Sequence, residues 1–352
     1  MRHALLLAAV LVPLFPSSPL LAAAKELIAA TIETTLASDG EHIRQLAFDG
    51  DDKSYFASEK GATVKDHFTL SVNKPVALRS VRVTTGLPTG ENKLDVGTLE
   101  ISVDGKRFAE LAKFHDGVAE AKPDGRKVQA VRIKPLKDLK HPLVIHEIVL
   151  RSDPSVAVFK YPVEYSVDVS DAPEMKEWAE KAARICEQQY TMINEELKAD
   201  GYQPPRRVRM RLKKIDGVAY ASGSRITGSV KYFKRHPDDF GAMVHETVHV
   251  VQNYRARGNP GWLVEGIADY IRFFKYEPGK LGRIDARRAR YDGSYRMTAA
   301  FLAYLTEKYD KQIVRKLNKM MRAGEYKKEA FHKWTGKVLE QLGDEWRATL
   351  GG

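Results

Sequence analysis

The spacing of hydrophobic residues changes part-way along the chain. Between residues 25 and 152, hydrophobic and polar residues alternate in short runs separated by Asp-Gly pairs, which is typical of strands and tight turns. The runs are His67–Val72, Leu78–Thr84, Leu99–Val103, Val128–Ile133 and Val144–Leu150. Helical spacing begins only after Pro173. The pattern predicts an all-β sandwich over residues 25–152, followed by a second domain over residues 153–352.

Two segments of the second domain have strong helical patterns. In residues 238–254, four residues follow the i, i+3, i+4, i+7 spacing of a buried helix face: Val244, Thr247, Val248 and Val251. Asp238 and Asp239 stand near its start, where carboxylates cap a helix and interact favourably with its dipole. A Gly-Asn-Pro-Gly turn then leads into Gly261–Ile271, which we expect to form a second helix.

The first of these helices contains the motif HExxH, formed by residues 245–249. His245 and His249 are four residues apart, so both lie on one face of the helix and can bind one zinc ion. Glu246 can then act as general base on a zinc-bound water. Two structural histidines on a helix are the competing interpretation.

A catalytic zinc ion needs a third protein ligand, and the second helix offers one. Glu265 and Asp269 lie four residues apart among apolar neighbours, where unpaired carboxylates would be costly. We expect Glu265 to bind the metal and Asp269 to accept the ring N–H of a ligand histidine, which fixes its tautomer. The alternative is that Asp269 is the third ligand.

The start of the chain indicates an exported protein. Arg2, a twelve-residue apolar stretch and three alanines ending at Ala24 together predict a signal peptide over residues 1–24. The apolar stretch is too short to span a membrane, and no other stretch is long enough. Cys186 has no partner for an intramolecular disulfide and falls on an apolar helical stripe, so we expect a buried thiol.

Basic residues are concentrated in the second domain. Residues 153–352 contain 36 Lys and Arg against 27 Asp and Glu, whereas residues 25–152 are nearly balanced. Arginines alternate with apolar residues over 206–212, which predicts a strand with one basic face. Attraction to an anionic cell surface is reasonable, although a merely soluble basic surface explains the charge as well. Nucleic-acid binding is disfavoured because no recognition motif is present.

The metal-binding motifs resemble those of known metallopeptidases. HExxH followed by Glu265 and a second acid resembles the gluzincins, although Val264 stands where aminopeptidases have asparagine. Residues 161–346 resemble more closely the basic secretory protein family of plants and bacteria, through GVAYASGSRITGS, MVHETVHVVQ, GWLVEGIADYIR and YRMTAAFLAYL. The metzincin pattern is excluded by Gln252 and Arg255. The resemblance implies a secreted, zincin-like α+β domain.

The resemblance to zincins implies further roles in the site. Zincins stabilise the oxyanion of the tetrahedral intermediate with a Tyr, His or Arg. Tyr295 opens a helical segment and is our candidate, with Tyr291 and His332 as competitors and core packing as the alternative for each tyrosine. An edge strand upstream of the site helix pairs with extended substrate in zincins, and we expect residues 218–230 to supply it.

The first domain resembles the discoidin, or factor 5/8 type C, family of galactose-binding-like jelly rolls. The strings FDGDDKSYFAS, TLEISVDGKRF and VIHEIVLRS carry the resemblance. Such domains often bind glycans, which makes Tyr55 and Phe56 candidate sugar platforms, and a pure packing role is the alternative. Some also hold a structural calcium ion. Asp49, Asp51 and Asp52 offer oxygen ligands for Ca2+, but a solvated turn explains them equally well.

The sequence therefore predicts an exported, two-domain zinc metallopeptidase that acts on peptides or proteins. Its sandwich would target the enzyme to cell-surface or cell-wall glycans. Two other classes remain open: a glycan- or surface-binding protein with a vestigial metal site, and a zinc amidase that acts on cell-wall peptide.

Overall fold

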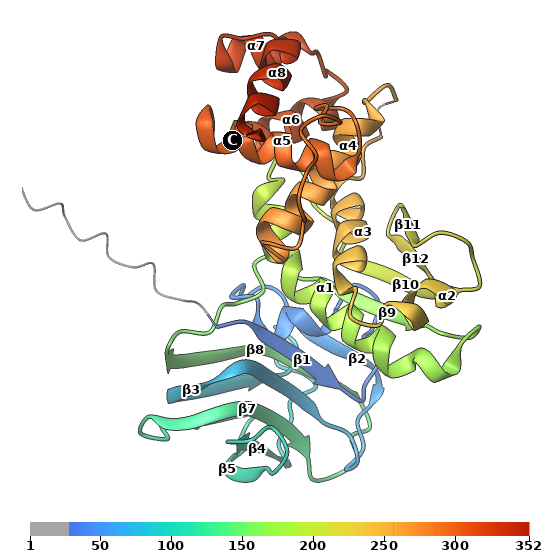
Figure 1. The fold of residues 1–352 in the computed structure, drawn as a ribbon. Helices are drawn as coiled ribbons and strands as arrows, with labels where there is room; N and C mark the ends of the chain where they lie inside the picture. The colour runs from blue at the N-terminus through green and yellow to red at the C-terminus, as the bar shows by residue number, and fades with distance from the viewer. Residues whose placement is uncertain (1–27, 256, 352) are drawn as a thin grey trace, which may run out of the picture.

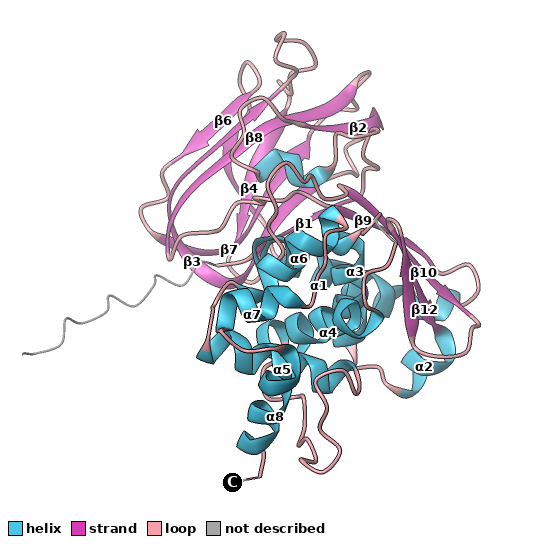
Figure 2. Cartoon of the chain, turned by 90° about the horizontal axis from the view of Figure 1, so that it is seen from above, coloured by secondary structure: helices cyan, strands magenta, loops and turns pink. Residues whose placement is uncertain are grey.

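The computed structural model describes residues 28–255 and 257–351, so the expected signal peptide lies outside the described residues. A body of long strands is followed along the chain by a bundle of helices with a small sheet at its side (Figure 1). The same separation of strands and helices is visible from above (Figure 2). We propose the domain boundary at residues 152 and 153, just before a connecting segment whose Val156 and Phe159 pack on the strands.

Within residues 28–159, antiparallel strands form the first body. They are β1 (Ala30–Thr34), β2 (Phe56–Gly61), β3 (Phe68–Thr85), β4 (Gly97–Ser102), β5 (Ala109–Lys113), β6 (Val118–Ala121), β7 (Arg126–Pro135) and β8 (Pro142–Asp153). The strand order is β2-β8-β3-β7-β4-β5, and both β1 and β6 pair with β3. A short 3-10 helix, η1 (Arg44–Phe48), contacts β8 and β2. This arrangement confirms the predicted β-sandwich.

Strand β3 is one strand of 18 residues, where the sequence predicted two. Its first half pairs with β1 and β7, and its second half pairs with β8 and β6, so it joins four other strands of the eight-stranded sheet. The stretch Asn73-Lys74-Pro75, which separated the predicted strands, falls where the register with β7 shifts between Ser71 and Val76. Proline has no N–H to donate, and strands tolerate it at such irregularities.

Apolar side chains from these strands fill the interior of the sandwich. Phe56 and Phe68 are fully buried, and their ring centroids lie 4.9 Å apart. The expectation that Phe56 is a sugar platform is therefore wrong, because Phe56 points into the core at the start of β2. Tyr55 is only half-buried and stacks on His42, with ring centroids 4.1 Å apart.

The second body begins with a small sheet. Its strands are β9 (Glu164–Asp168), β10 (Arg207–Lys213), β11 (Ala219–Ser222) and β12 (Arg225–Ser229). Their order is β11-β12-β10-β9; β10 is parallel to both neighbours, and β11 is antiparallel to β12 at the edge. The strand with a basic face that the sequence predicted is β10. Its exposed Arg209 forms an ion pair with Asp168 on β9, at 2.7 Å.

Helices make up the rest of the second body. They are η2 (Pro173–Met175), α1 (Lys176–Glu196), α2 (Val230–Arg235), α3 (Phe240–Gln252), α4 (Gly261–Ile271), the π-helical η3 (Arg272–Tyr276), α5 (Tyr295–Lys308), α6 (Ile313–Ala323), α7 (Glu329–Thr335) and α8 (Leu339–Thr349). Helices α1 and α3 contact each other and the sheet. Cys186 on α1 is buried, as predicted. None of the helices in the described part of the chain is long and apolar enough to cross a membrane.

Helix α3 is the predicted HExxH helix, shortened by two residues at each end. Its N-cap is Asp239, whose carboxylate accepts a hydrogen bond from the Ala242 N–H at 3.1 Å. The helix ends at Gln252, and its C-cap Asn253 adopts a left-handed conformation with φ of 35°. Asparagine tolerates this conformation better than most residues, so the helix has a defined end at each side of the motif.

Candidate metal centre and active site

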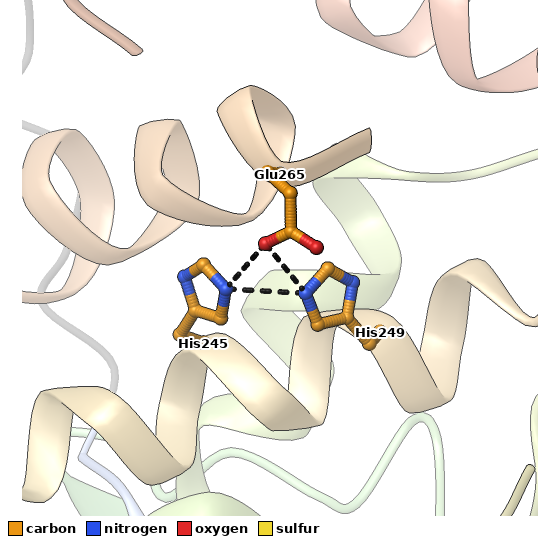
Figure 3. Close-up of side chains that lie close together, drawn as sticks. All are labelled: His245, His249 and Glu265. Carbon is orange, nitrogen blue, oxygen red and sulfur yellow. Dashed lines mark hydrogen bonds and ion pairs between the residues drawn. The ribbon is translucent and has the colours of Figure 1, made fainter. Parts of the chain in front are cut away.

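The structure brings the three predicted ligands together. His245 and His249 point from α3 toward α4, and Glu265 reaches back to both (Figure 3). The Nε2 atoms of the two imidazoles are 3.1 Å apart. Glu265 Oε2 lies 3.2 Å from His245 Nε2 and 3.3 Å from His249 Nε2. Ligand atoms placed tetrahedrally around zinc at about 2.0 Å lie about 3.3 Å from one another. The triangle therefore has the dimensions of one face of a zinc site.

Each ligand histidine is held through its other ring nitrogen. His245 Nδ1 lies 2.7 Å from Asp269 Oδ1, and His249 Nδ1 lies 2.7 Å from Gln252 Oε1. Carboxylate and amide oxygens can only accept, so both Nδ1 atoms carry the hydrogen. In neutral rings, the Nε2 lone pairs would face each other and Glu265, an arrangement that needs a proton or a cation between them.

Gln252 has a second contact that the sequence did not reveal. Its Nε2 donates to the backbone carbonyl of Val264 on α4 at 3.0 Å, and its side chain is buried. One amide thereby orients His249 and joins the end of α3 to the turn that carries Glu265. Its position three residues after His249, on the same helix face, was the only signal available.

Charge in the site favours a bound cation. Burial raises the pKa of Glu265, but hydrogen bonds from His245 and His249 outweigh this and lower it to about 2. Burial lowers the pKa of His245, but hydrogen bonds to Asp269 and Glu265 outweigh this and raise it to about 9. Both shifts have the same cause, because the carboxylates attract positive charge to the point where the three ligand atoms meet.

Glu246 lies beside this point, between α3 and the edge strand. Only 7% of its surface is exposed, and burial raises its pKa above the usual value while the two histidines oppose the shift. The backbone N–H of Ala221 on β11 hydrogen-bonds its carboxylate. The same carboxylate therefore lies near the candidate metal ligands and beside the strand predicted to bind substrate.

A cavity of about 910 Å³ opens over the metal centre. Residues of β11, α3, α4 and the first turn of α5 line it. The predicted edge strand is thus present and faces the site. The segment 218–230 supplies it as the hairpin of β11 and β12.

Of the three candidates for stabilising an oxyanion, only Tyr295 lies at the site. It is 53% exposed, lines the cavity, and its ring centroid is 6.3 Å from that of His245. Tyr291 instead packs against Trp262 and Phe301. His332 lies on α7, and within the described residues neither it nor Tyr291 lines the cavity.

The acidic turn of the first domain is organised by its own hydrogen bonds. Asp49 accepts from the Asp51 N–H at 3.1 Å and from the Ser54 hydroxyl at 2.8 Å, and Asp51 accepts from the Lys53 N–H at 3.0 Å. In the described part of the chain, the one group of ligand side chains close enough to hold a metal ion is the centre on α3 and α4. The expected Ca2+ site gains no support.

Comparison with known families assigns the second domain. A family model described as a peptidase of plants and bacteria matches residues 164–346, slightly more than half of the chain. The chain belongs to this family. This confirms the resemblance to the basic secretory proteins, and it establishes the second domain as that of a peptidase family. A search of curated proteins found no match.

Three of the solved structures that are similar to part of this chain are carbohydrate-binding modules. One is CBM32-1 from a Clostridium perfringens family 31 glycoside hydrolase, with 19% identity, 34% of this chain and 92% of that chain covered, and a TM-score of 0.30. Another is chitosan-binding module 1 from a Paenibacillus chitosanase/glucanase, with 14% identity, 34% and 93% covered, and a TM-score of 0.30. A third is the Streptococcus pneumoniae fucose-binding module SpX-3, with 13% identity, 34% and 91% covered, and a TM-score of 0.30.

Proposed function

We propose that the protein is a zinc-dependent peptidase whose metal ligands are His245, His249 and Glu265 and whose general base is Glu246. The observation that carries this proposal is the triangle of ligand atoms, with edges of 3.1 to 3.3 Å, beside a buried carboxylate. Membership of a peptidase family supports the reaction class.

The donor set suits a catalytic zinc ion. Two imidazole nitrogens and one carboxylate oxygen leave a fourth tetrahedral position open, whereas structural zinc sites fill all four with protein ligands. When bound, the metal would lower the pKa of a water molecule and polarise the substrate carbonyl. Asp269 and Gln252 support this use of the site, because they keep both Nε2 lone pairs directed at one point.

Glu246 would move the proton. Its burial and raised pKa make it a stronger base than an exposed glutamate, so it can take a proton from the attacking water. The same carboxyl then passes the proton to the leaving amine nitrogen. Tyr295 would donate its phenol O–H to the oxygen that becomes negative as the carbonyl is attacked.

The edge strand would orient the substrate. A peptide added antiparallel to β11 would lie along the cavity with its backbone in the extended form. The cavity of about 910 Å³ is open enough to receive such a segment. Alternate side chains would then face the metal centre and the solvent.

For the sandwich we propose attachment to a glycan-bearing surface, in an exported protein. The feature that favours this is Tyr55, which is half-buried and held parallel to His42 at 4.1 Å, so that its position is fixed by a neighbour. Binding of the full chain and of Tyr55→Ala to a glycan array tests this. Equal binding by both proteins would show that Tyr55 does not contact the glycan.

The metal is tested before the reaction. Elemental mass spectrometry of the purified mature protein should find about one zinc per chain and much less in His249→Ala. Glu246→Gln should retain the metal and lose turnover of casein. A chain that takes up no metal after zinc loading would contradict the enzyme proposal and favour a binding protein with a vestigial site.

Ligand choice and substrate class need separate measurements. Glu265→Ala should weaken zinc binding far more than Asp269→Ala, because removing a residue that only orients a ligand histidine costs about 10- to 100-fold in affinity. The reverse order would make Asp269 the third ligand. Digestion of casein and of peptidoglycan side by side distinguishes a peptidase from a cell-wall amidase, since the metal centre acts on either kind of amide.

A further inference from the structure

Two arginines lie at one end of the active-site cavity, and within the described residues only one of them is paired with carboxylates. This end lies at the start of α3, where the lining includes Asp239, Arg272, Phe273 and Arg296. A second cavity of about 380 Å³ shares these four residues with the first. The group therefore stands at an opening between the metal centre and the surface.

Arg272 is fully engaged with the protein. Its Nη2 lies 2.6 Å from Asp239 Oδ1, its Nε lies 2.7 Å from Glu277 Oε1, and only 15% of its side chain is exposed. Asp239 also accepts from the Tyr232 hydroxyl at 2.7 Å and caps α3. Arg272, Asp239 and Glu277 therefore neutralise one another, and none of these charges is available to a ligand.

Arg296 has no such partner. Its side chain is exposed, its guanidinium carbon lies 5.0 Å from the centroid of the Phe273 ring, and in residues 28–255 and 257–351 no carboxylate forms an ion pair with it. Contact with the ring restricts the guanidinium without neutralising it. The protein thus holds a free, oriented cation at the mouth of the cavity.

The position of Arg296 on its helix adds an independent reason. It is the second residue of α5, directly after Tyr295, and the first turn of α5 contains no acidic residue. The dipole of a helix disfavours cations at its N-terminus, so an unpaired arginine there is unfavourable in the free protein. A bound anion would be attracted both by the guanidinium and by this end of the helix.

We propose that Arg296 recognises a carboxylate of the substrate at the end of the cavity near the start of α3. The proposal rests on the peptidase function and names a substrate class for it. The carboxylate comes either from an aspartate or glutamate side chain or from the C-terminus of the peptide. Both have the planar pair of oxygens that a guanidinium binds through two hydrogen bonds.

The experiment uses the zinc-loaded full chain and sets of fluorescent peptides with blocked ends. In each set, glutamate replaces glutamine at one position at a time, and a matched pair differs only in a free or amidated C-terminus. Arg296→Ala should lower kcat/KM about tenfold for the preferred carboxylate peptide and leave its neutral partner nearly unchanged. Arg287→Ala, an exposed arginine outside this cavity, is the matched control.

Binding of the same peptides to Glu246→Gln, with and without Arg296→Ala, separates this inference from the proposed function. A carboxylate preference that disappears with Arg296 supports the inference even if the parent enzyme cleaves no peptide, in which case only the peptidase proposal fails. Equal affinities of the two variants for carboxylate and neutral peptides would overturn the inference, whether or not the peptides are cleaved. The position of the preferred glutamate, or a preference for the free C-terminus alone, identifies the source of the carboxylate.

Discussion

Removing Arg44 should destabilise the helical domain, although Arg44 belongs to the sandwich. Its guanidinium hydrogen-bonds Glu187 on α1 and lies 3.6 Å from Glu164 on β9, and the Arg44 and Glu187 side chains are only 11% and 3% exposed. Glu187 also accepts from the Tyr165 N–H at 2.7 Å. The Tyr165 hydroxyl in turn contacts Thr247 of the HExxH helix at 2.9 Å.

The magnitude follows from what remains after Arg44→Met. Breaking a buried ion pair by removing one partner costs about 3–5 kcal/mol, because the other charge stays buried. Arg184 still contacts Glu187 at 2.9 Å and offsets part of this loss. We therefore expect the free energy of unfolding to fall by about 3 kcal/mol, at the lower end of that range. Adding Glu187→Gln, which removes the charge but retains an acceptor for Tyr165, should recover much of it.

The assay uses the position of the tryptophans. All four lie on helices of the second domain, namely Trp178, Trp262, Trp334 and Trp346. Their fluorescence during urea unfolding therefore reports on that domain and not on the sandwich that carries Arg44. Arg82→Met is the matched control, since its pair with Glu120 is about half exposed and should contribute under about 1 kcal/mol.

The pH dependence of this defect has a definite sign. Burial raises the pKa of Glu187, and Arg44 opposes the rise. Without Arg44, the folded state keeps a proton on Glu187 to a higher pH than the unfolded state does. A folded state that binds more protons gains stability as the pH falls. The deficit of Arg44→Met should be smaller at about pH 6 than at about pH 8. A tryptophan-detected transition that Arg44→Met leaves unchanged at both values would refute the coupling between the two domains.

Two further predictions concern the metal centre. Gln252→Ala should weaken zinc binding about 10- to 100-fold in a chelator competition, because His249 loses its orienting partner, and unchanged affinity would assign Gln252 to packing alone. Gly266→Ala would put a methyl group 2.0 Å from the Thr298 methyl group, so thermal unfolding should reveal a loss of about 1–3 kcal/mol. Partial recovery in the double variant with Thr298→Ala would locate the clash between α4 and α5, and no recovery would contradict it.

The grouping of His245, His249 and Glu265 could be predicted from the sequence because these residues lie on two helices with clear periodicity. His245 and His249 are fixed by the geometry of one helix, and Glu265 and Asp269 by that of the next. Their assignment needed no knowledge of tertiary structure beyond the packing of two neighbouring segments. The predicted ends of α3 were wrong by two residues, because Asp239 is the N-cap at one end and Asn253 adopts a left-handed conformation at the other.

Contacts between distant segments could not be predicted in the same way. The approach of Arg44 to Glu187 spans 143 residues, and no periodic pattern links a 3-10 helix of the sandwich to α1. The continuous strand β3 was missed for a related reason. A proline ends most strands unless a bulge accommodates it, and the irregularity that accommodates Pro75 depends on the pairing of β3 with β7. Phe56 was misassigned because only the pairing of β2 decides which of two adjacent aromatic residues points into the core.

The two variable positions of the HExxH motif explain why the site depends on the rest of the molecule. Thr247 and Val248 are fully buried, and helical geometry places Thr247 on the face of α3 opposite the two histidines. The Thr247 hydroxyl donates to the Met243 carbonyl at 2.9 Å and contacts the Tyr165 hydroxyl, so it ties the helix to β9. Because Tyr165 donates its backbone N–H to the carboxylate that Arg44 binds, the helix is held from behind by a chain of polar contacts that ends in the sandwich. The first domain therefore helps to hold the helix that carries His245 and His249. This structural role is separate from any binding role that the domain has.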